Sequence, residues 1–226
     1  MQTRKHSLLF SLLLTLLGLL LPGGLLAAQA QIAYLEGDVG VERGGAALAA
    51  SIGMPLETGD FVITGATGIA IVALTPQTTI KTRENTRVRI EAVGDNARVN
   101  LTSGGLFSRI VGHLAGSYEV TTPTTVAGVR GTEFFIAYGR TVEKAPDLWL
   151  CVNSGIVAVS IPQTGKSVSV PAGKGINILS GIQLTDPRAY TWTKGLNWNM
   201  DPAKAPVLDN TKLDQAYTDL LNQDYD

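Results

Sequence analysis

The chain has 226 residues, enough for one domain or for one domain with an appendage, because domains usually span about 100–200 residues. Hydrophobic residues make up 45% and charged residues 16%, which excludes disorder as the bulk state. The formal net charge of −1 disfavours nucleic acid as a partner. The only cysteine is Cys151 and the histidines are His6 and His113, too few for a Cys/His metal cluster or an internal disulfide, so we expect no metal and no cofactor.

Residues 1–30 have the pattern of a secretory leader. Two basic residues precede a leucine-rich run from Ser7 to Leu21, and a small-residue A-x-A motif ends at Ala30. Cleavage after Ala30 would make Gln31 the first residue and place the protein in the periplasm, or elsewhere outside the cytoplasm. The alternative is an uncleaved membrane anchor, since no charge appears again before Glu36 and a membrane span needs about 20 apolar residues.

From Ile32 to about Ile182 the hydrophobic pattern has a period of two, interrupted by glycine, proline or asparagine, which is typical of an all-β sandwich, barrel or solenoid. The rows Tyr118/Val120, Phe134/Ile136/Tyr138 and Leu148/Leu150/Val152 are expected to face the core. We expect strands at Ile32–Leu35, Gly40–Glu42, Phe61–Thr64, Gly68–Leu74, Thr78–Lys81, Arg87–Ala92, Ala97–Leu101, Leu106–Val111, Ser117–Thr121, Thr132–Tyr138, Leu148–Val152, Ile156–Ile161, Ser167–Val170 and Ile176–Leu179.

The pattern changes after Gly181, and residues 183–226 are expected to form a linker and an acidic C-terminal tail. Asp209 or Asn210 could cap the start of a short helix in this tail. The helix could dock on the β domain through its apolar face, or it could meet a partner. That face is indicated by four residues at helical spacing: Leu213, Tyr217, Leu220 and Leu221.

Several motifs follow one another in a recognisable order. Gly59-Asp60-Phe61-Val62-Ile63-Thr64-Gly65 precedes the apolar run Gly68–Leu74, and Leu101-Thr102-Ser103-Gly104-Gly105-Leu106-Phe107 follows later. The signature is Val126-Ala127-Gly128-Val129-Arg130-Gly131-Thr132-Glu133-Phe134. In this order the motifs resemble the FecR-like domain, a periplasmic module named after an iron-citrate signalling regulator, and the resemblance covers about Ile32 to Leu179.

The resemblance implies an elongated two-sheet sandwich or β-solenoid-like stack over residues 31–182, between the leader (1–30) and the tail (183–226). It also implies a non-enzymatic module for recognition of another envelope protein or ligand, with a place in envelope signalling. Transmembrane regulators of this family carry a cytoplasmic domain before the membrane span, whereas only residues 1–6 precede the apolar run here. We therefore expect no direct contact with a sigma factor.

The residues of the signature indicate a role in the conformation of the backbone. Gly128 and Gly131 permit a positive φ or a close approach of strands, and Thr132 could form a local hydrogen bond before the strand that carries Phe134. Arg130 could hold a carboxylate of a partner, or it could clamp a loop carbonyl within its own domain. No residue of the signature supplies a nucleophile.

Four basic residues share one parity along an extended segment and could form a basic stripe: Lys81, Arg83, Arg87 and Arg89. Such a stripe could bind an anionic glycan, a lipid head group or an acidic peptide, or it could only protect a solvent-facing edge from aggregation. With no nucleophilic constellation in the sequence, we expect a partner to be held by strand addition or by a surface patch. The alternatives are a cell-wall carbohydrate-binding module with Trp192 and Trp198 as an aromatic platform, and a hydrolase that uses a carboxylate pair.

Overall fold

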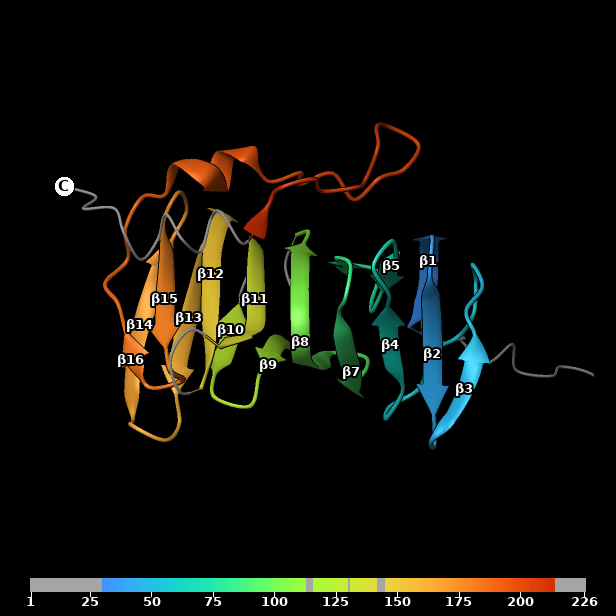
Figure 1. Ribbon diagram of the computed structural model, residues 1–226, viewed down its shortest axis with the longest axis horizontal. Coiled ribbons are helices and arrows are strands. Elements are labelled where there is room, and N and C mark those ends of the chain that lie inside the picture. The colour runs from blue at the N-terminus through green and yellow to red at the C-terminus, as the bar shows by residue number, and fades with distance from the viewer. Residues whose placement is uncertain (1–29, 113–115, 130, 142–144, 214–226) are drawn as a thin grey trace, which may run out of the picture.

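The computed structural model describes residues 30–112, 116–129, 131–141 and 145–213 (Figure 1). Most of these residues lie in strands, which stand side by side along the long axis of an elongated molecule. The all-β prediction is confirmed, and the architecture is a two-sheet sandwich. The tail helix expected around Leu213–Leu221 falls almost entirely outside the described residues.

Among the described residues, sheet A contains eight strands, and all its neighbouring strands are antiparallel. One edge of sheet A is the first strand of the domain, and the other edge is the last. The order is β1 (Gln31–Glu36), β5 (Ile69–Ala73), β6 (Thr78–Thr82), β8 (Asn96–Ile110), β11 (Glu133–Thr141), β12 (Pro146–Ser154), β15 (Gly175–Leu179) and β16 (Gln183–Leu184).

In the part of the chain that the structure describes, sheet B contains nine strands and shares β8 with sheet A. Its neighbours are antiparallel except for the parallel pair of β8 with β9. The order is β3 (Ala46–Ala49), β2 (Val39–Arg43), β4 (Phe61–Thr64), β7 (Arg87–Ala92), β8, β9 (Ser117–Thr121), β10 (Val126–Val129), β13 (Ile156–Ile161) and β14 (Lys166–Pro171).

Strand β8 connects the two sheets. Its first part pairs with β7 as far as Ser103, and from Gly104 it pairs with β11 in the other sheet. Gly104 has a φ of 94°, and a Cβ at this position would overlap Thr86. Because an L-residue with a side chain rarely adopts this conformation, glycine is required where the strand crosses between the sheets.

The main core lies between the two sheets. The expected rows Phe134/Ile136/Tyr138 and Leu148/Leu150/Val152 all belong to it, as do Tyr118 and Val120. These row predictions are confirmed. The sheet system ends at Leu184, just past the boundary expected at residue 182.

A third layer covers the outer face of sheet A. Residues 190–213, which we call the strap, begin with a 3₁₀ helix at Thr191–Gly195 and run back across sheet A to β5 (Figure 1). Leu196 and Met200 of the strap bury the aromatic side chains on the outer face of β8, β11 and β12, while Val207 packs on Ile69 and Ile71 of β5. Within the described part of the chain, no helix has the length and hydrophobicity to span a membrane.

Candidate functional site

Lys81 joins the strap to sheet A. Its side chain is 1% exposed, and its ammonium donates hydrogen bonds to the main-chain carbonyls of Asn197 (2.6 Å), Asn199 (2.8 Å) and Val207 (3.0 Å). The Nζ also lies 4.3 Å from the centre of the Phe107 ring. Burial lowers the pKa of Lys81 to about 8, with nearby Asp209 acting in the opposite direction. Lys81 is thus a structural clamp for the strap.

Two arginines reinforce this clamp. Arg83 is 5% exposed, lies 3.3 Å from a carboxylate oxygen of Asp209 and donates to the carbonyl of Thr211 at 2.8 Å. Arg109 donates to the carbonyl of Trp198 at 2.6 Å and forms an ion pair with Glu133. Lys81, Arg83 and Arg109 therefore all bond to main-chain carbonyls of the strap.

The expected basic stripe does not form one surface. Lys81 and Arg83 lie beneath the strap on sheet A, whereas Arg87 and Arg89 belong to β7 of sheet B. The Arg87 guanidinium stacks 3.9 Å from the centre of the Phe61 ring and pairs with Glu42, and the Arg89 guanidinium lies 5.6 Å from the same ring. Of the four residues of the predicted stripe, only Arg87 and Arg89 have partly or fully exposed side chains.

The signature motif contributes to the backbone and the core. Gly131 has a φ of 63°, as the sequence indicated, whereas Gly128 lies in β10 without a positive φ. Phe134 is fully buried, and Thr132 is 1% exposed. The carbonyl of Thr132 accepts a hydrogen bond from Ile110, but its hydroxyl bonds to no described residue, so the expected local bond is absent there. Arg130 and His113 lie outside the described residues.

The candidate reactive groups are occupied by structural contacts. Cys151 is buried under the strap, and burial raises its pKa well above the usual thiol range. Asp60 is held by Arg43, and this hydrogen bond keeps the pKa of Asp60 low. Among the described residues, no three His, Cys, Asp or Glu side chains gather as a metal site.

The aromatic platform considered for a carbohydrate ligand is not available at Trp198. Its ring is only partly exposed, packs edge-on against Phe107 at 5.3 Å and donates through Nε1 to the carbonyl of Thr193. The side chain of Trp192 lies outside the described part of the structure.

An open groove of about 1070 Å³ lies beside the end of the strap. Its charged lining residues are balanced in sign: Arg83, Arg140 and Lys212 against Glu36, Glu84 and Asp209. A groove with balanced charge does not select a ligand of one sign. The edges of the sheets are therefore better candidates for a recognition surface.

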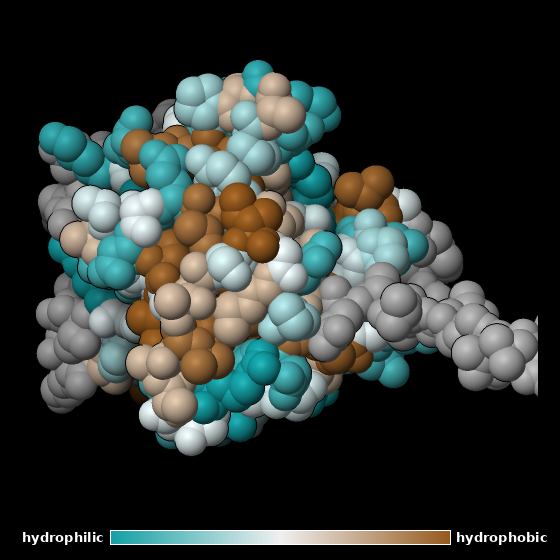
Figure 2. Space-filling view, turned by 90° about the vertical axis from the view of Figure 1, so that its right-hand side faces the viewer, coloured by the Kyte–Doolittle hydropathy of each residue, from teal (hydrophilic) through white to brown (hydrophobic). Residues whose placement is uncertain are grey.

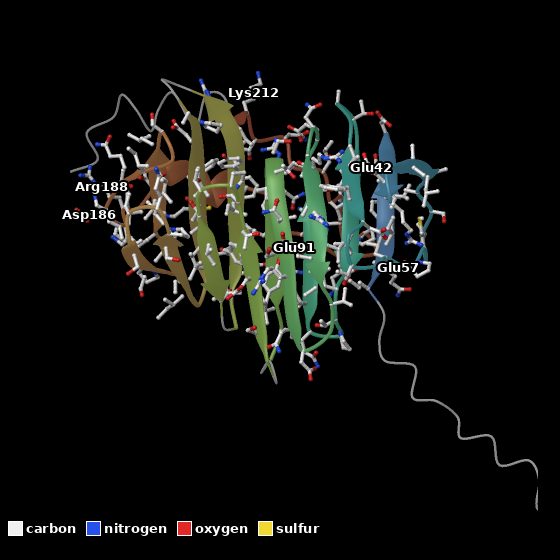
Figure 3. All side chains as sticks on the ribbon, turned by 90° about the horizontal axis from the view of Figure 1, so that it is seen from below. Glu42, Glu57, Glu91, Asp186, Arg188 and Lys212 are labelled. Atoms are coloured by element: carbon white, nitrogen blue, oxygen red, sulfur yellow. The ribbon has the colours of Figure 1, made fainter. Side chains whose placement is uncertain are left out.

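Three of the four sheet edges are protected. The outer side of β1 is bonded to residues 53–56, for example through Ile32 N–H to the Met54 carbonyl at 3.0 Å. Strand β14 carries Lys166 and Pro171, and β16 has only two residues with Asp186 and Arg188 close by (Figure 3). Charges, prolines and short strands are the usual means by which proteins prevent pairing at an edge.

The fourth edge, β3, has neither a charged residue nor a proline. Its sequence is Ala46-Ala47-Leu48-Ala49, without a charge or a proline, and within the described part of the chain it pairs only with β2. The nearby Ile52 is 64% exposed. Figure 2 shows apolar residues gathered on this end of the molecule. We call residues 44–54 with β3 at their centre the β3 end.

The turn before β3 determines which of its main-chain groups are free. Gly44 and Gly45 both have a positive φ, 57° and 84°, as in a two-residue type I′ hairpin. In such a hairpin the flanking residues Arg43 and Ala46 exchange hydrogen bonds, and every second pair does so thereafter. The N–H and C=O groups of Ala47 and Ala49 therefore point away from β2, toward the open edge.

The sequence did not predict β3. Three of its four residues are alanine, which favours helices over strands, so the segment after Glu42 carried no strand signal. A usable signal was present in Gly44-Gly45 directly after an expected strand, because glycine pairs mark hairpin turns.

Comparison with known protein families agrees with the resemblance found in the sequence. Residues 60–157 match the family described as FecR protein. Two crystal structures, both described as an anti-sigma factor candidate from Parabacteroides distasonis ATCC 8503, are similar with TM-scores of 0.49 and identities of 14% and 16%. The similarities cover 60% and 64% of this chain, and 63% and 69% of those chains. Among curated proteins none matches the sequence.

Proposed function

We propose that this chain, whose residues 60–157 form a FecR domain, is an exported and non-enzymatic module that binds another protein of the cell envelope through its β3 end. One observation carries the proposal: β3 is an uncharged edge with outward main-chain donors and acceptors at Ala47 and Ala49. Strand addition uses such groups for affinity. The β3 end precedes the matched FecR range, so it adds a feature of this chain to the family domain.

Export is the second part of the proposal. Residues 1–30 act as the leader, residues 31–182 as the β domain, and residues 183–226 as the linker and tail. Processing near Ala30 releases the protein into the periplasm, and an uncleaved leader would anchor it to the membrane instead. Either outcome places the β3 end outside the cytoplasm, consistent with a FecR domain that has no direct sigma-factor contact.

A protein partner suits the β3 end better than a glycan does. The exposed groups are main-chain amides and carbonyls beside alanine and isoleucine side chains, whereas glycan sites rely on exposed aromatic rings and convergent polar side chains. Trp198, half of the platform considered for a glycan, packs against Phe107 instead.

Proline substitution on the free side of β3 tests the proposal. Ala47→Pro with Ala49→Pro removes two outward N–H groups and leaves the bonds between β2 and β3 in place, because proline is tolerated where the N–H does not serve the ladder. Ser169→Pro is the matched control on the opposite edge of sheet B. Ser169 shares the parity of Pro171, which already occupies an outward position of β14.

The measurement is capture of envelope proteins by purified chains, compared by quantitative mass spectrometry. We expect one or more partners to be lost with the β3 variant and retained with Ser169→Pro, while both variants melt close to the parent. Equal capture by the parent and the β3 variant would refute recognition through β3. A partner lost when Arg87 and Arg89 are changed to serine, with a steep salt dependence, would assign recognition to the accessible basic pair instead.

A further inference from the structure

The two faces of β3 differ, and this difference constrains any strand that pairs with it. Leu48 is opposite Val41, which is 1% exposed in the core, so Leu48 and Ala46 lie on the inner face. Ala47 is opposite Glu42 on the outer, solvent-facing side of sheet B. Because side chains alternate along a strand, a neighbour added to β3 would place one row against the core and the other row in solvent.

The inner row ends at an incompletely covered part of the core. Leu48, Ala50 and Met54 pack against the main core but stay only partly buried, and Ile52, which lies between Ala50 and Met54 in the chain, is 64% exposed. The outer row offers only small side chains, Ala47 and Ala49, next to Gly40. An added strand would therefore gain apolar burial through its inner row alone.

A second copy of this chain is a poor occupant for this edge. Pairing β3 with another β3 would bring alanines against alanines over four residues and bury little apolar surface beyond the two leucines. A stable interface needs about 1,000 Å² with good complementarity. Larger apolar side chains from a different protein would fill the space that the alanines leave.

On the basis of the proposed function, we propose that β3 accepts an extended segment of a partner protein in which bulky apolar residues alternate with polar residues. The apolar row packs on Leu48, Met54 and Ile52, and the polar row faces solvent above Ala47 and Ala49. The main chain of the segment bonds to the N–H and C=O groups of Ala47 and Ala49. Sheet B thereby gains a tenth strand.

Two synthetic peptides of equal composition test this inference. In the first peptide, valine alternates with threonine and lysine, and in the second, the valines are contiguous. The readout is amide hydrogen exchange of the full chain by NMR, followed at Ala47 and Ala49. We expect the alternating peptide to slow exchange at both amides by roughly tenfold or more, and the contiguous peptide to leave it unchanged.

Two variants separate the contribution of main-chain hydrogen bonds to peptide binding from that of apolar packing. Ala47→Pro with Ala49→Pro should abolish peptide binding, followed for this variant by shifts of the Leu48 and Ile52 resonances. Leu48→Thr should weaken binding while keeping both amides available. Ser169→Pro, the matched control, should bind the alternating peptide normally.

The possible outcomes distinguish this inference from the proposed function. Equal protection by both peptides, or by neither, overturns the requirement for an alternating segment. If neither protects but the β3 prolines still remove an envelope partner, the proposed function stands and only this inference fails. A dimer in analytical ultracentrifugation that the β3 prolines dissolve would overturn the inference in favour of a second copy.

Discussion

At the scale of single residues, the buried ammonium of Lys81 has all three of its donors matched by carbonyls of the strap. Lys81→Met keeps most of the apolar stem but leaves three carbonyl oxygens without this donor. We expect the free energy of unfolding to fall by about 1–3 kcal/mol, the cost of unsatisfied buried polar groups. Urea unfolding measures it, with Lys166→Met on an exposed site as the control. Equal midpoints for the two variants would contradict the clamp.

The pH dependence of stability gives a second test of Lys81. Its pKa is about 8 in the folded chain and 10.5 in the unfolded chain, so between these values the unfolded state binds more protons. Stability contributed by this group must then rise as pH increases from about 8 to 10.5. The difference in unfolding free energy between the parent and Lys81→Met should grow over this window. A flat difference would show that Lys81 titrates normally.

Ala30 links the processing site to the fold. Its side chain is fully buried, and its carbonyl accepts a hydrogen bond from Leu56 N–H at 2.8 Å. A recombinant chain that begins at Gln31 lacks both contacts, whereas one that begins at Gln29 keeps them. We expect the shorter chain to be less stable by about 1 kcal/mol in chemical denaturation. Identical stability would mean that cleavage after Ala30 costs the fold nothing.

The two signature glycines provide a matched pair. Gly131 has a φ of 63°, and a Cβ there would make one ordinary contact, 3.8 Å from the Gly112 carbonyl oxygen, whereas Gly128 has open space without a positive φ. Gly131→Val should therefore cost about 1–3 kcal/mol from backbone strain alone. Gly128→Val should stay within about 0.5 kcal/mol of the parent. Thermal melts decide, and an unchanged melting temperature for Gly131→Val would mean that the backbone tolerates a side chain there.

At the scale of elements, β11 and β12 explain what sequence patterning captured and what it missed. Alternation correctly placed Phe134, Ile136, Leu148 and Leu150 in the core. The opposite rows, with Phe135 and Trp149, are also buried, because the strap covers that face. The sequence did carry a signal for this second buried face, because apolar residues occupy both alternating positions of β11 and β12. Strands that are covered on both faces have such continuous hydrophobic runs.

The basic residues show a second limit of patterning. Shared parity predicted that Lys81 and Arg89 lie on one face of the domain. The chain passes from sheet A to sheet B between β6 and β7, so the two residues lie on opposite outer faces of the sandwich. Parity along a segment specifies a face only within one sheet.

The strap should control access to Cys151. Leu196 and Met200 pack in the same cluster as this cysteine, whereas Leu208 of the strap is 44% exposed. Leu196→Ser with Met200→Ser should raise the rate at which a thiol reagent labels Cys151, while Leu208→Ser should leave the rate near that of the parent. The labelling rates are measured below the melting temperature of each variant, so that they report on shielding of the thiol and not on unfolding. Equal rates for all three chains would show that the strap does not shield the thiol.

At the scale of the whole molecule, the two ends of the sandwich differ in whether their edge strands carry charges or prolines. Asp186 and Arg188 lie at one end, near the short strand β16 and the proline-bearing β14, and the uncharged β3 lies at the other (Figure 3). The fold class and most strands were predictable because their alternation is local. The open edge was not, because exposure of an edge depends on which strand has no neighbour after the sheets assemble.

Recognition through the β3 end is the central claim, and site-specific photo-crosslinking in intact cells tests it most directly. A photoreactive amino acid at position 47 on β3 is compared with one at position 169 on β14, in chains that are otherwise identical. We predict a discrete crosslink to another envelope protein from position 47, absent from position 169 and lost when Ala49 is changed to proline. Crosslinks from position 169 alone, or the same products from both positions, would contradict recognition through β3.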